Sequence, residues 1–286
     1  MIKFIFNFFT ILLLVFTIIN NKKLIAANPN HAIPLNSSQN PWRSIGVLEN
    51  NNKKCTAIVV GNNLLLTSAY CLIDENGNKI NSTQQLLFKA GYKNGFYLVK
   101  TTINSFLMPK IIYPPNNIND TKNSWAFLFT TKNISDITGT MRIYKEPITS
   151  KYIKNHKIIT VGYTGKEDNG LFASIKCEFN KSDINFNDKS FVDTQSSPIL
   201  LQICSDYFSP LIGSPVIAID KENNASIIGI ISAKLTKNTK DNTNMAIPQS
   251  VNVVIPMTYL NNQDSKSSLE NYQNNDDLEK ALRNTP

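Results

Sequence analysis

Short apolar runs, broken by polar turn-forming segments, recur along the chain at close intervals. In the first half the apolar runs are SIGVLE, CTAIVV, NLLLTSA, QLLFKAGY, FYLVKTTINSFLM and SWAFLFTT. The breaks include GNN, DENGN and YPPNN. β-Branched and aromatic residues dominate the runs, which is typical of an all-β domain built from hairpins.

A second series of similar runs follows a more polar stretch at about residues 132–154. Its members are KIITVGYT, LFASIKCEF, ILLQIC, SPVIAI, SIIGIISAKL and NVVIPM. The pattern predicts two six-strand β units in tandem, without a fixed-period repeat. The predicted parts are a signal peptide (1–27), a connector (28–40), a first β unit (41–135), a linker (136–154), a second β unit (155–260) and a polar tail (261–286).

The N-terminus carries the pattern of a targeting segment. One early lysine precedes a long apolar run, MIKFIFNFFTILLLVFTII, and the small residues Ala26 and Ala27 follow. This order predicts a secretory signal peptide cleaved near Ala27. An uncleaved N-terminal anchor is the alternative, because the run is near the lower length limit of a spanning helix. We expect export to the periplasm or the extracellular space, and no membrane span in the mature chain.

The four cysteines become interpretable if the chain is exported, because an even count outside the cytoplasm predicts disulfides. Four cysteines permit three pairings. The order along the chain, two early and two late, favours Cys55–Cys71 and Cys177–Cys204. With no CxxC pair and only two histidines, the sequence predicts neither a zinc site nor a cofactor.

Composition predicts a folded chain with no specialised charge pattern. Of its 286 residues, 42% are hydrophobic and 17% are charged. This hydrophobic share is large enough for the chain to fold around a core. The formal net charge of +8 comes almost entirely from scattered lysines, with Arg43, Arg142 and Arg283 as the only arginines. Nucleic-acid binders usually gather their cations on one face, so the lysines indicate a solvated surface instead.

Four strings in order resemble the trypsin-like serine peptidases, in particular the bacterial secreted, glutamyl-endopeptidase-like branch. They are NPWRSIGVL (40–48), CTAIVVGNNLLLTSAYCL (55–72), NSWAFLF (123–129), and a segment from VGYTG (161–165) to SPLIGSPV (209–216). The resemblance covers roughly residues 40–258. It implies a chymotrypsin-like fold, in which two six-stranded antiparallel barrels pack around a cleft.

The resemblance places the family's catalytic triad at positions 70, 124 and 212, where this chain has Tyr70, Ser124 and Ile212. An imidazole base accepts a proton near neutral pH, whereas a tyrosine phenol with a pKa of about 10 is a donor at pH 7. Ser124 supplies no negative charge, and Ile212 has no nucleophilic atom. We therefore predict that the chain is not an enzyme.

The predicted oxyanion position is also altered. The family has a glycine two residues before its nucleophile, and Pro210 stands there in this chain. Proline has no backbone N–H to donate. Loss of one such donor typically costs about 2.7–4 kcal/mol of transition-state stabilisation.

A relocated catalytic centre has few candidate residues. His31 lies in the connector and His156 at the start of the second β series, so neither is expected to face the cleft. Hydroxyls near the resembling strings more often form turns than act as nucleophiles; they are Ser209, Ser214, Thr67 and Ser68. A serine–lysine pair using Lys221 is possible in principle. Asp206 is expected to be a solvated loop acid.

The string GIISAKL (229–235) resembles the family strand that pairs with the substrate backbone. Such a strand can bind an extended peptide without cutting it. We therefore predict a secreted serine-peptidase homologue, a pseudoprotease, that binds an unidentified protein or peptide. Two alternatives remain open: an active hydrolase with a relocated nucleophile or base, and a surface or envelope protein that uses the β scaffold only structurally.

Overall fold

The computed structural model describes residues 32–51, 53–115, 118–164, 170–175, 177–180, 200–204, 209–235, 251–257 and 260. The predicted signal peptide (1–27) and the predicted polar tail (261–286) fall outside these residues, as do His31 and Asp206. The described part is mostly β, as the spacing of the apolar runs predicts.

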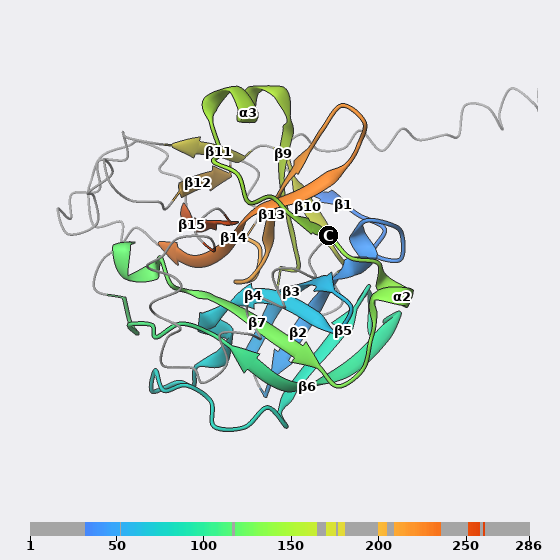
Figure 1. Ribbon diagram of the computed structural model, residues 1–286, viewed down its shortest axis with the longest axis vertical. Helices are drawn as coiled ribbons and strands as arrows, with labels where there is room; N and C mark the ends of the chain where they lie inside the picture. The colour runs from blue at the N-terminus through green and yellow to red at the C-terminus, as the bar shows by residue number, and fades with distance from the viewer. Residues whose placement is uncertain are drawn as a thin grey trace, which may run out of the picture. The chain divides into compact units, whose positions relative to one another are not determined.

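Six antiparallel strands of the first half form a closed barrel (Figure 1). They are β2 (Ile45–Asn50), β3 (Lys53–Gly61), β4 (Leu64–Ser68), β5 (Leu86–Ala90), β6 (Val99–Leu107) and β7 (Trp125–Thr130). The order around the barrel is β2-β3-β4-β7-β6-β5, and β5 pairs back onto β2. Closure gives every strand two hydrogen-bonded neighbours, so this half has no open sheet edge.

Strands β4 and β7 are buried on both faces, which explains their unbroken apolar sequences LLLTS and WAFLFT. Successive side chains of a strand point to opposite faces. Ala126 and Leu128 therefore pack inside the barrel, whereas Trp125 and Phe127 join a second cluster that includes residues of the other half. The Trp125 and Phe127 rings meet edge to face, 5.7 Å apart between centroids.

The second half forms a nine-stranded sheet. Its main path is β1 (Ile33–Pro34), β10 (Phe172–Ser174), β9 (Lys157–Gly162), β13 (Pro215–Ile219), β14 (Ala225–Leu235), β15 (Val251–Pro256), β12 (Leu200–Cys204) and β11 (Cys177–Asn180), and β8 (Arg142–Ile143) pairs in parallel with β14.

This sheet differs from the predicted second six-stranded barrel, because no strand pairing closes it among the described residues. Two physical reasons are visible. Strands β10 and β11 are only three and four residues long. Two extra strands, β1 and β8, come from the segments expected to be a connector and a linker.

The helices are short. They are the 3-10 turns η1 (Trp42–Ser44), η2 (Ala69–Leu72) and η3 (Ile118–Thr121), and the α-helices α2 (Ser135–Thr138) and α3 (Ser150–Asn155). Among the described residues, no helix has the length and apolar character that crossing a membrane requires.

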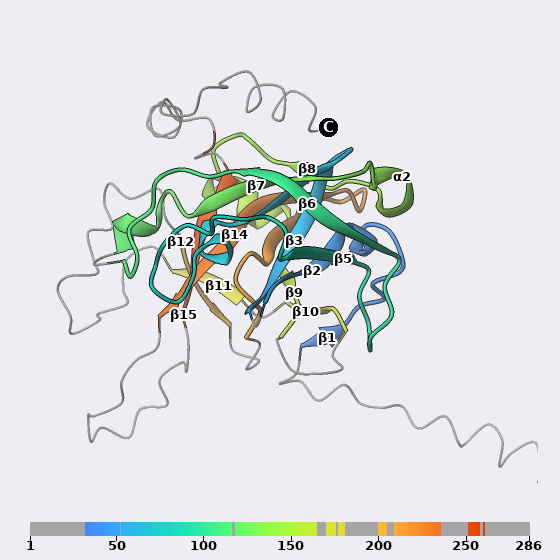
Figure 2. The ribbon, with the colours of Figure 1, turned by 90° about the horizontal axis from the view of Figure 1, so that it is seen from below.

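Strand β14 connects the sheet to the barrel, where it lies beside β4 and η2 (Figure 2). The backbone N–H of Thr56 in β3 donates to the Ile212 carbonyl at 2.9 Å. The N–H of Gly213 donates in turn to the Ile231 carbonyl of β14 at 2.7 Å. Residues 212–213 are therefore fixed between the two halves, and this junction holds the candidate site.

Candidate functional site

Tyr70 lies in η2, directly after β4, where Ser68 caps the turn by accepting a hydrogen bond from the Tyr70 N–H at 3.2 Å. Its side chain is only 4% exposed. The phenol donates to the Ile112 carbonyl at 3.4 Å, and its ring lies 5.8 Å from that of Tyr113. Tyr70 is thus a packed side chain whose polar end already has a partner.

Burial, together with the nearby charge of Asp120 and the Tyr113 phenol, raises the pKa of Tyr70 to about 12. At neutral pH the phenol therefore keeps its proton, whereas an imidazole base would be available to accept one. Asp120, in η3, was missed by the sequence reasoning. The sequence feature that could have indicated Asp120 as a neighbour of the site is its position four residues before Ser124.

Ser124 is fully buried at the start of β7. Its hydroxyl donates to the Thr121 carbonyl at 2.5 Å and is hydrogen-bonded to the Ser232 hydroxyl of β14. Its carbonyl accepts the N–H of Ala69, the residue before Tyr70, at 3.1 Å. The hydroxyl links β7 to β14 and carries no charge with which to orient a base.

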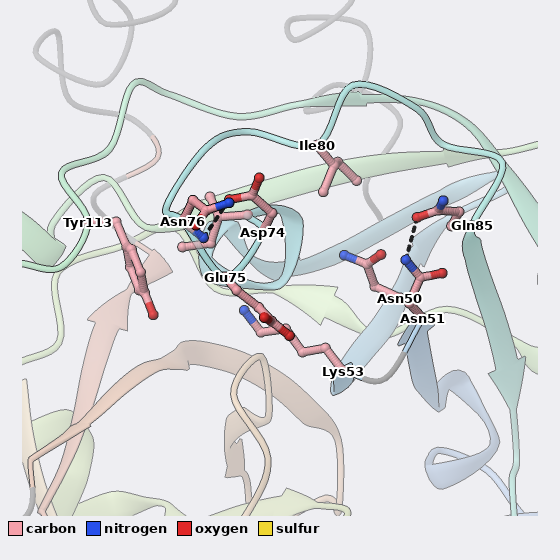
Figure 3. Close-up of a pocket in the computed structure, with 10 residues that line it drawn as sticks. Asn50, Asn51, Lys53, Asp74, Glu75, Asn76, Ile80, Gln85 and Tyr113 are labelled. Carbon is pink, nitrogen blue, oxygen red and sulfur yellow. Dashed lines mark hydrogen bonds between the residues drawn. The ribbon is translucent and has the colours of Figure 1, made fainter.

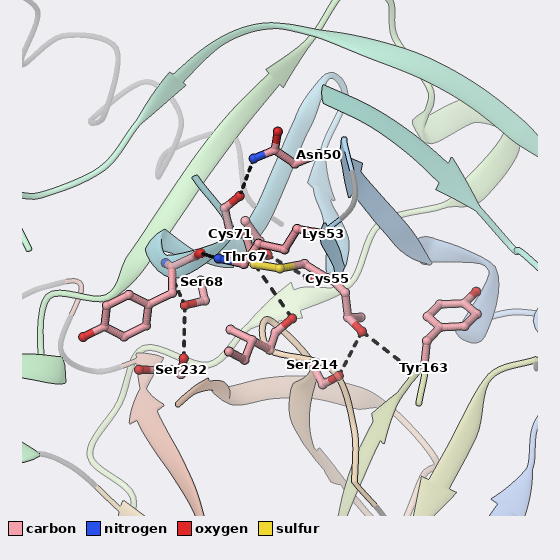
Figure 4. The surroundings of a disulfide bond; sticks show 12 residues. Asn50, Lys53, Cys55, Thr67, Ser68, Cys71, Tyr163, Ser214 and Ser232 are labelled. Carbon is pink, nitrogen blue, oxygen red and sulfur yellow. Dashed lines mark hydrogen bonds between the residues drawn. A yellow bond between two sulfur atoms is a disulfide. The ribbon is translucent and has the colours of Figure 1, made fainter. Parts of the chain in front are cut away.

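Ile212 is half-buried and packs against the apolar cluster that contains both cysteines of the first disulfide. Its carbonyl oxygen lies 3.9 Å from the Sγ of Cys71. Figure 4 shows the Cys55–Cys71 disulfide at this junction. Through Cys71 and Ala69, the segments that hold Tyr70, Ser124 and Ile212 come together at one junction.

The backbone around Pro210 offers few free donors. Pro210 is buried and has no N–H. The N–H of Leu211 donates to the Tyr163 carbonyl at 2.7 Å, and that of Gly213 to Ile231. Gly213 has a φ of +86°, and a Cβ there would lie 2.1 Å from the Thr56 carbonyl oxygen, so only glycine fits this turn.

The hydroxyls considered as nucleophiles are mostly engaged inside the protein. Ser214 donates to the Thr56 hydroxyl at 2.9 Å, and Thr67 donates to the Thr56 carbonyl at 2.7 Å. Ser68 donates to the Ser232 carbonyl at 3.4 Å. Their bonds hold strands together, which matches the expectation that such hydroxyls are structural.

His156 is held away from these residues by its own contacts. Its ring stacks on Tyr152 with centroids 3.9 Å apart, and its Nδ1 lies 2.7 Å from the Tyr152 carbonyl oxygen at the end of α3. Lys221 is exposed. Neither residue contacts Tyr70, Ser124 or Ile212.

Among the described residues, one serine–lysine pair is hydrogen-bonded, and it uses Lys234 in place of the Lys221 suggested by sequence proximity. The Lys234 Nζ donates to the Ser209 hydroxyl at 2.8 Å. Burial lowers the pKa of Lys234, which favours its neutral, basic form. The pairing was missed because the two residues are 25 positions apart and on different segments.

The end of β14 presents a partly open edge beside this pair. Residues 215–219 of β13 pair with β14 only as far as Ile230. From Ala233 to Leu235, β14 pairs with β15 alone among the residues that the structure describes. On the other side of this segment, within GIISAKL, no described strand pairs with the backbone.

A polar pocket of about 600 Å³ adjoins the Tyr70 turn (Figure 3). It is lined by Asn50, Asn51, Lys53, Ile73, Asp74, Glu75, Asn76, Ile80, Gln85 and Tyr113. Lys53 donates to the Tyr70 carbonyl, and its burial lowers its pKa. The pocket therefore shares Lys53 and Tyr113 with the surroundings of Tyr70, and it offers amide and carboxylate groups to a polar ligand.

Both predicted disulfides are confirmed: Cys55–Cys71 and Cys177–Cys204. Disulfides of this kind are typical of proteins outside the cytoplasm. Within the described ranges, no group of three or more histidine, cysteine, aspartate or glutamate side chains is arranged to hold a metal ion.

Comparisons with known proteins show the fold but not a family. No family model matches the chain. No curated protein matches it either. Among solved structures, it is similar to one titled "Structure of Glu endopeptidase in complex with MPD", with a TM-score of 0.56 and 15% sequence identity, covering 85% of this chain and 97% of that chain. The similarity shows that this chain has the chymotrypsin-like peptidase fold.

Proposed function

We propose that this chain is an exported, catalytically inactive serine-peptidase homologue that binds an extended peptide along β14. The observation that carries the proposal is the half-open edge at Ala233–Leu235, next to a junction where Tyr70, Ser124 and Ile212 occupy the predicted triad positions. An exposed strand edge gives a peptide backbone hydrogen bonds without any chemical step.

The chemistry at the junction supports inactivity. Tyr70 is a buried proton donor, the Ser124 hydroxyl is bonded inside the protein, and Ile212 has no reactive atom. Pro210 has no N–H at the predicted oxyanion position. The polar pocket around Lys53 offers a neighbouring place for a side chain of the bound peptide.

A fluorophosphonate probe tests the inactive state directly, because it labels an activated serine hydroxyl. We expect no labelling of the purified exported protein, with an active trypsin-like peptidase as the positive control. Labelling at any serine would overturn the proposal.

Restoring the predicted triad tests the assignment of positions. We expect that Tyr70→His, Ser124→Asp and Ile212→Ser together leave the chain inactive while Pro210 remains, because the oxyanion donor is still missing. Substantial turnover by this triple variant would show that the account of the oxyanion position is wrong.

Peptide binding is tested by hydrogen–deuterium exchange with a tryptic digest of casein as the peptide source. Protection is expected at residues 233–235, since added strands slow exchange of the amides that they pair with. Unchanged exchange across β14, despite retention of peptide elsewhere on the protein, would remove the edge from the proposal.

A second candidate function is a hydrolase that uses Ser209 and Lys234. The 2.8 Å hydrogen bond and the lowered pKa of Lys234 favour it, because a neutral lysine can remove the serine proton. Probe labelling mapped to Ser209, and abolished in Lys234→Met with the fold unchanged, would support this candidate over the inactive homologue.

Export is part of the proposal. Two disulfides and the apolar N-terminal sequence support it. N-terminal sequencing of protein recovered from the periplasm or the medium should find a start near residue 28, whereas an intact Met1 would favour the uncleaved anchor.

A further inference from the structure

The hairpin that joins β5 to β6 ends in a tight, well-bonded turn. Asn94 and Gly95 both have positive φ, of 49° and 84°. Lys93 and Phe96 exchange backbone hydrogen bonds of 2.8 and 2.9 Å, as in a two-residue type I′ hairpin. A Cβ added at Gly95 would have no atom within 4 Å, so the turn projects into open space.

This turn carries three exposed apolar side chains in succession. Phe96 is 81% exposed, the largest value among the exposed large hydrophobic residues of the described chain. Tyr97 is 45% and Leu98 40% exposed. Three such residues in succession at the end of a hydrogen-bonded turn form an exposed apolar tip, which marks an interaction site more than scattered exposed residues do.

Two lysines flank this tip. Lys93 and Lys100 are exposed and have no carboxylate partner among the described residues. Lys89, opposite Lys100, is neutralised by Glu49 at 2.7 Å. The sequence from residue 76 to residue 119 contains five lysines and no aspartate or glutamate. The hairpin therefore combines an apolar tip with flanking positive charge.

We propose that the β5–β6 hairpin docks on an anionic lipid bilayer, with Phe96, Tyr97 and Leu98 inserted at the headgroup level and Lys93 and Lys100 facing the lipid phosphates. Aromatic and leucine side chains favour this boundary, and nearby lysines add attraction to anionic headgroups. A projecting tip suits a planar surface. The proposal is independent of whether the β14 edge binds peptide.

Phe96→Trp places a fluorescent reporter on the tip. The substitution leaves the turn intact, because the turn is held by backbone hydrogen bonds. The exported protein is mixed with vesicles of phosphatidylcholine containing phosphatidylglycerol, or of phosphatidylcholine alone, and the parent spectrum is subtracted to remove Trp42 and Trp125. We expect emission from Trp at position 96 to shift to shorter wavelength, and to be quenched by brominated lipid, only with the anionic vesicles.

Two matched variants separate this docking from other membrane contacts. Because each lysine near an anionic surface contributes appreciably, Lys93→Gln with Lys100→Gln should weaken the insertion reported at position 96 about 30-fold at low ionic strength. The variant Ile137→Trp places the reporter on an exposed residue of α2 in a protein with the same N-terminal segment. Its tryptophan emission should not shift on anionic vesicles. Circular dichroism of each variant checks that the fold is unchanged.

Three outcomes would overturn the proposal: no shift at position 96 on anionic vesicles, an equal shift on both vesicle types, or an equal shift at position 137. A shift that appears without lipid and grows with protein concentration would also overturn it, and would show that a second copy of the chain covers the tip.

Discussion

The two halves of this molecule complete their sheets in different ways. In the first half, β5 pairs with β2 and the backbone closes the barrel. In the second, a side-chain hydrogen bond of 2.8 Å from Thr160 in β9 to the Gln202 Oε1 in β12 joins strands that no described backbone ladder connects. The barrel is closed by backbone pairing, whereas this link across the open second sheet depends on which side chains the strands carry.

The interiors differ accordingly. Phe88, Leu65 and Leu128 fill the first barrel, and all three are fully buried. The second sheet has an apolar core of its own, which includes Ile217, Ile228 and Ile231, and it also buries Thr160, Ser174 and the amide side chains of Gln202 and Asn252. Gln202 and Asn252 face each other across β12 and β15, and the Gln202 Nε2 and the Asn252 Oδ1 have no hydrogen-bond partner among the described residues.

The difference teaches that the same β architecture can rest on two kinds of interaction. Apolar burial is non-directional and tolerates small movements, whereas buried polar groups stabilise a fold only when each has its partner. We therefore expect the first barrel to respond most to lost volume, and the second sheet to respond most to lost hydrogen bonds.

The largest expected effect comes from emptying the first barrel. Phe88→Ala should lower the free energy of unfolding by about 3–5 kcal/mol, because it removes a fully buried ring and leaves a cavity. The measurement is the midpoint of guanidinium unfolding with both disulfides intact. Phe96→Ala, which truncates a mostly exposed ring, is the control and should change stability by about 0.5 kcal/mol at most. Equal effects of the two would contradict the assignment of the core.

An intermediate effect is expected from the Thr160–Gln202 hydrogen bond across the second sheet. Thr160→Val leaves the buried Gln202 amide without its donor and should cost about 1–3 kcal/mol. Adding Gln202→Leu removes the stranded amide, so the double variant should recover to within about 1 kcal/mol of the parent. Urea unfolding of the parent, both single variants and the double variant completes the cycle.

The matched control for this cycle is Thr102→Val, on the exposed face of β6 in the first barrel. Its hydroxyl is hydrogen-bonded to the Thr131 hydroxyl at the surface, so its loss should be small. If Thr160→Val and Gln202→Leu prove additive, the hydrogen bond between them does not couple the two strands, and the comparison between the halves fails.

The sequence predicts the first half better than the second for the same physical reason. Apolar runs such as WAFLFT reveal a strand by their composition, and the order of the cysteines is enough to favour Cys55–Cys71. The two-residue strands β1 and β8 have no pattern of their own, since each exists only through its pairing with a longer strand.

Contacts in the candidate site follow the same division. The strings around Tyr70, Ser124 and Ile212 are recognisable because their apolar frames resemble a family. The pairs Thr160–Gln202 and Ser209–Lys234 join residues 42 and 25 positions apart. Nothing in the local sequence marks such partners. A single polar residue in a strand gives the same local pattern whether its side chain is hydrogen-bonded, exposed to solvent or buried without a partner.

The smallest expected effect concerns one tyrosine in each half at alkaline pH. Burial is the main cause that raises the pKa of both Tyr70 and Tyr152 to about 12. In the unfolded chain a phenol ionises near pH 10. Below that pH both states are protonated. As the pH rises toward 12 the unfolded state gains charge that the folded state resists, so stability falls across this window and then levels off.

Replacing either phenol should flatten this dependence. Tyr70→Phe and Tyr152→Phe should each reduce the loss of stability between about pH 9 and about pH 11, measured by urea unfolding. Asp120→Asn separates the two halves, because its charge raises the pKa of Tyr70 and is not a cause of the shift at Tyr152. In a spectrophotometric titration it should lower the pKa of Tyr70 in the Tyr152→Phe background and leave that of Tyr152 unchanged in the Tyr70→Phe background. A change at both sites would mean that Asp120 acts through the fold as a whole and not through its proximity to Tyr70.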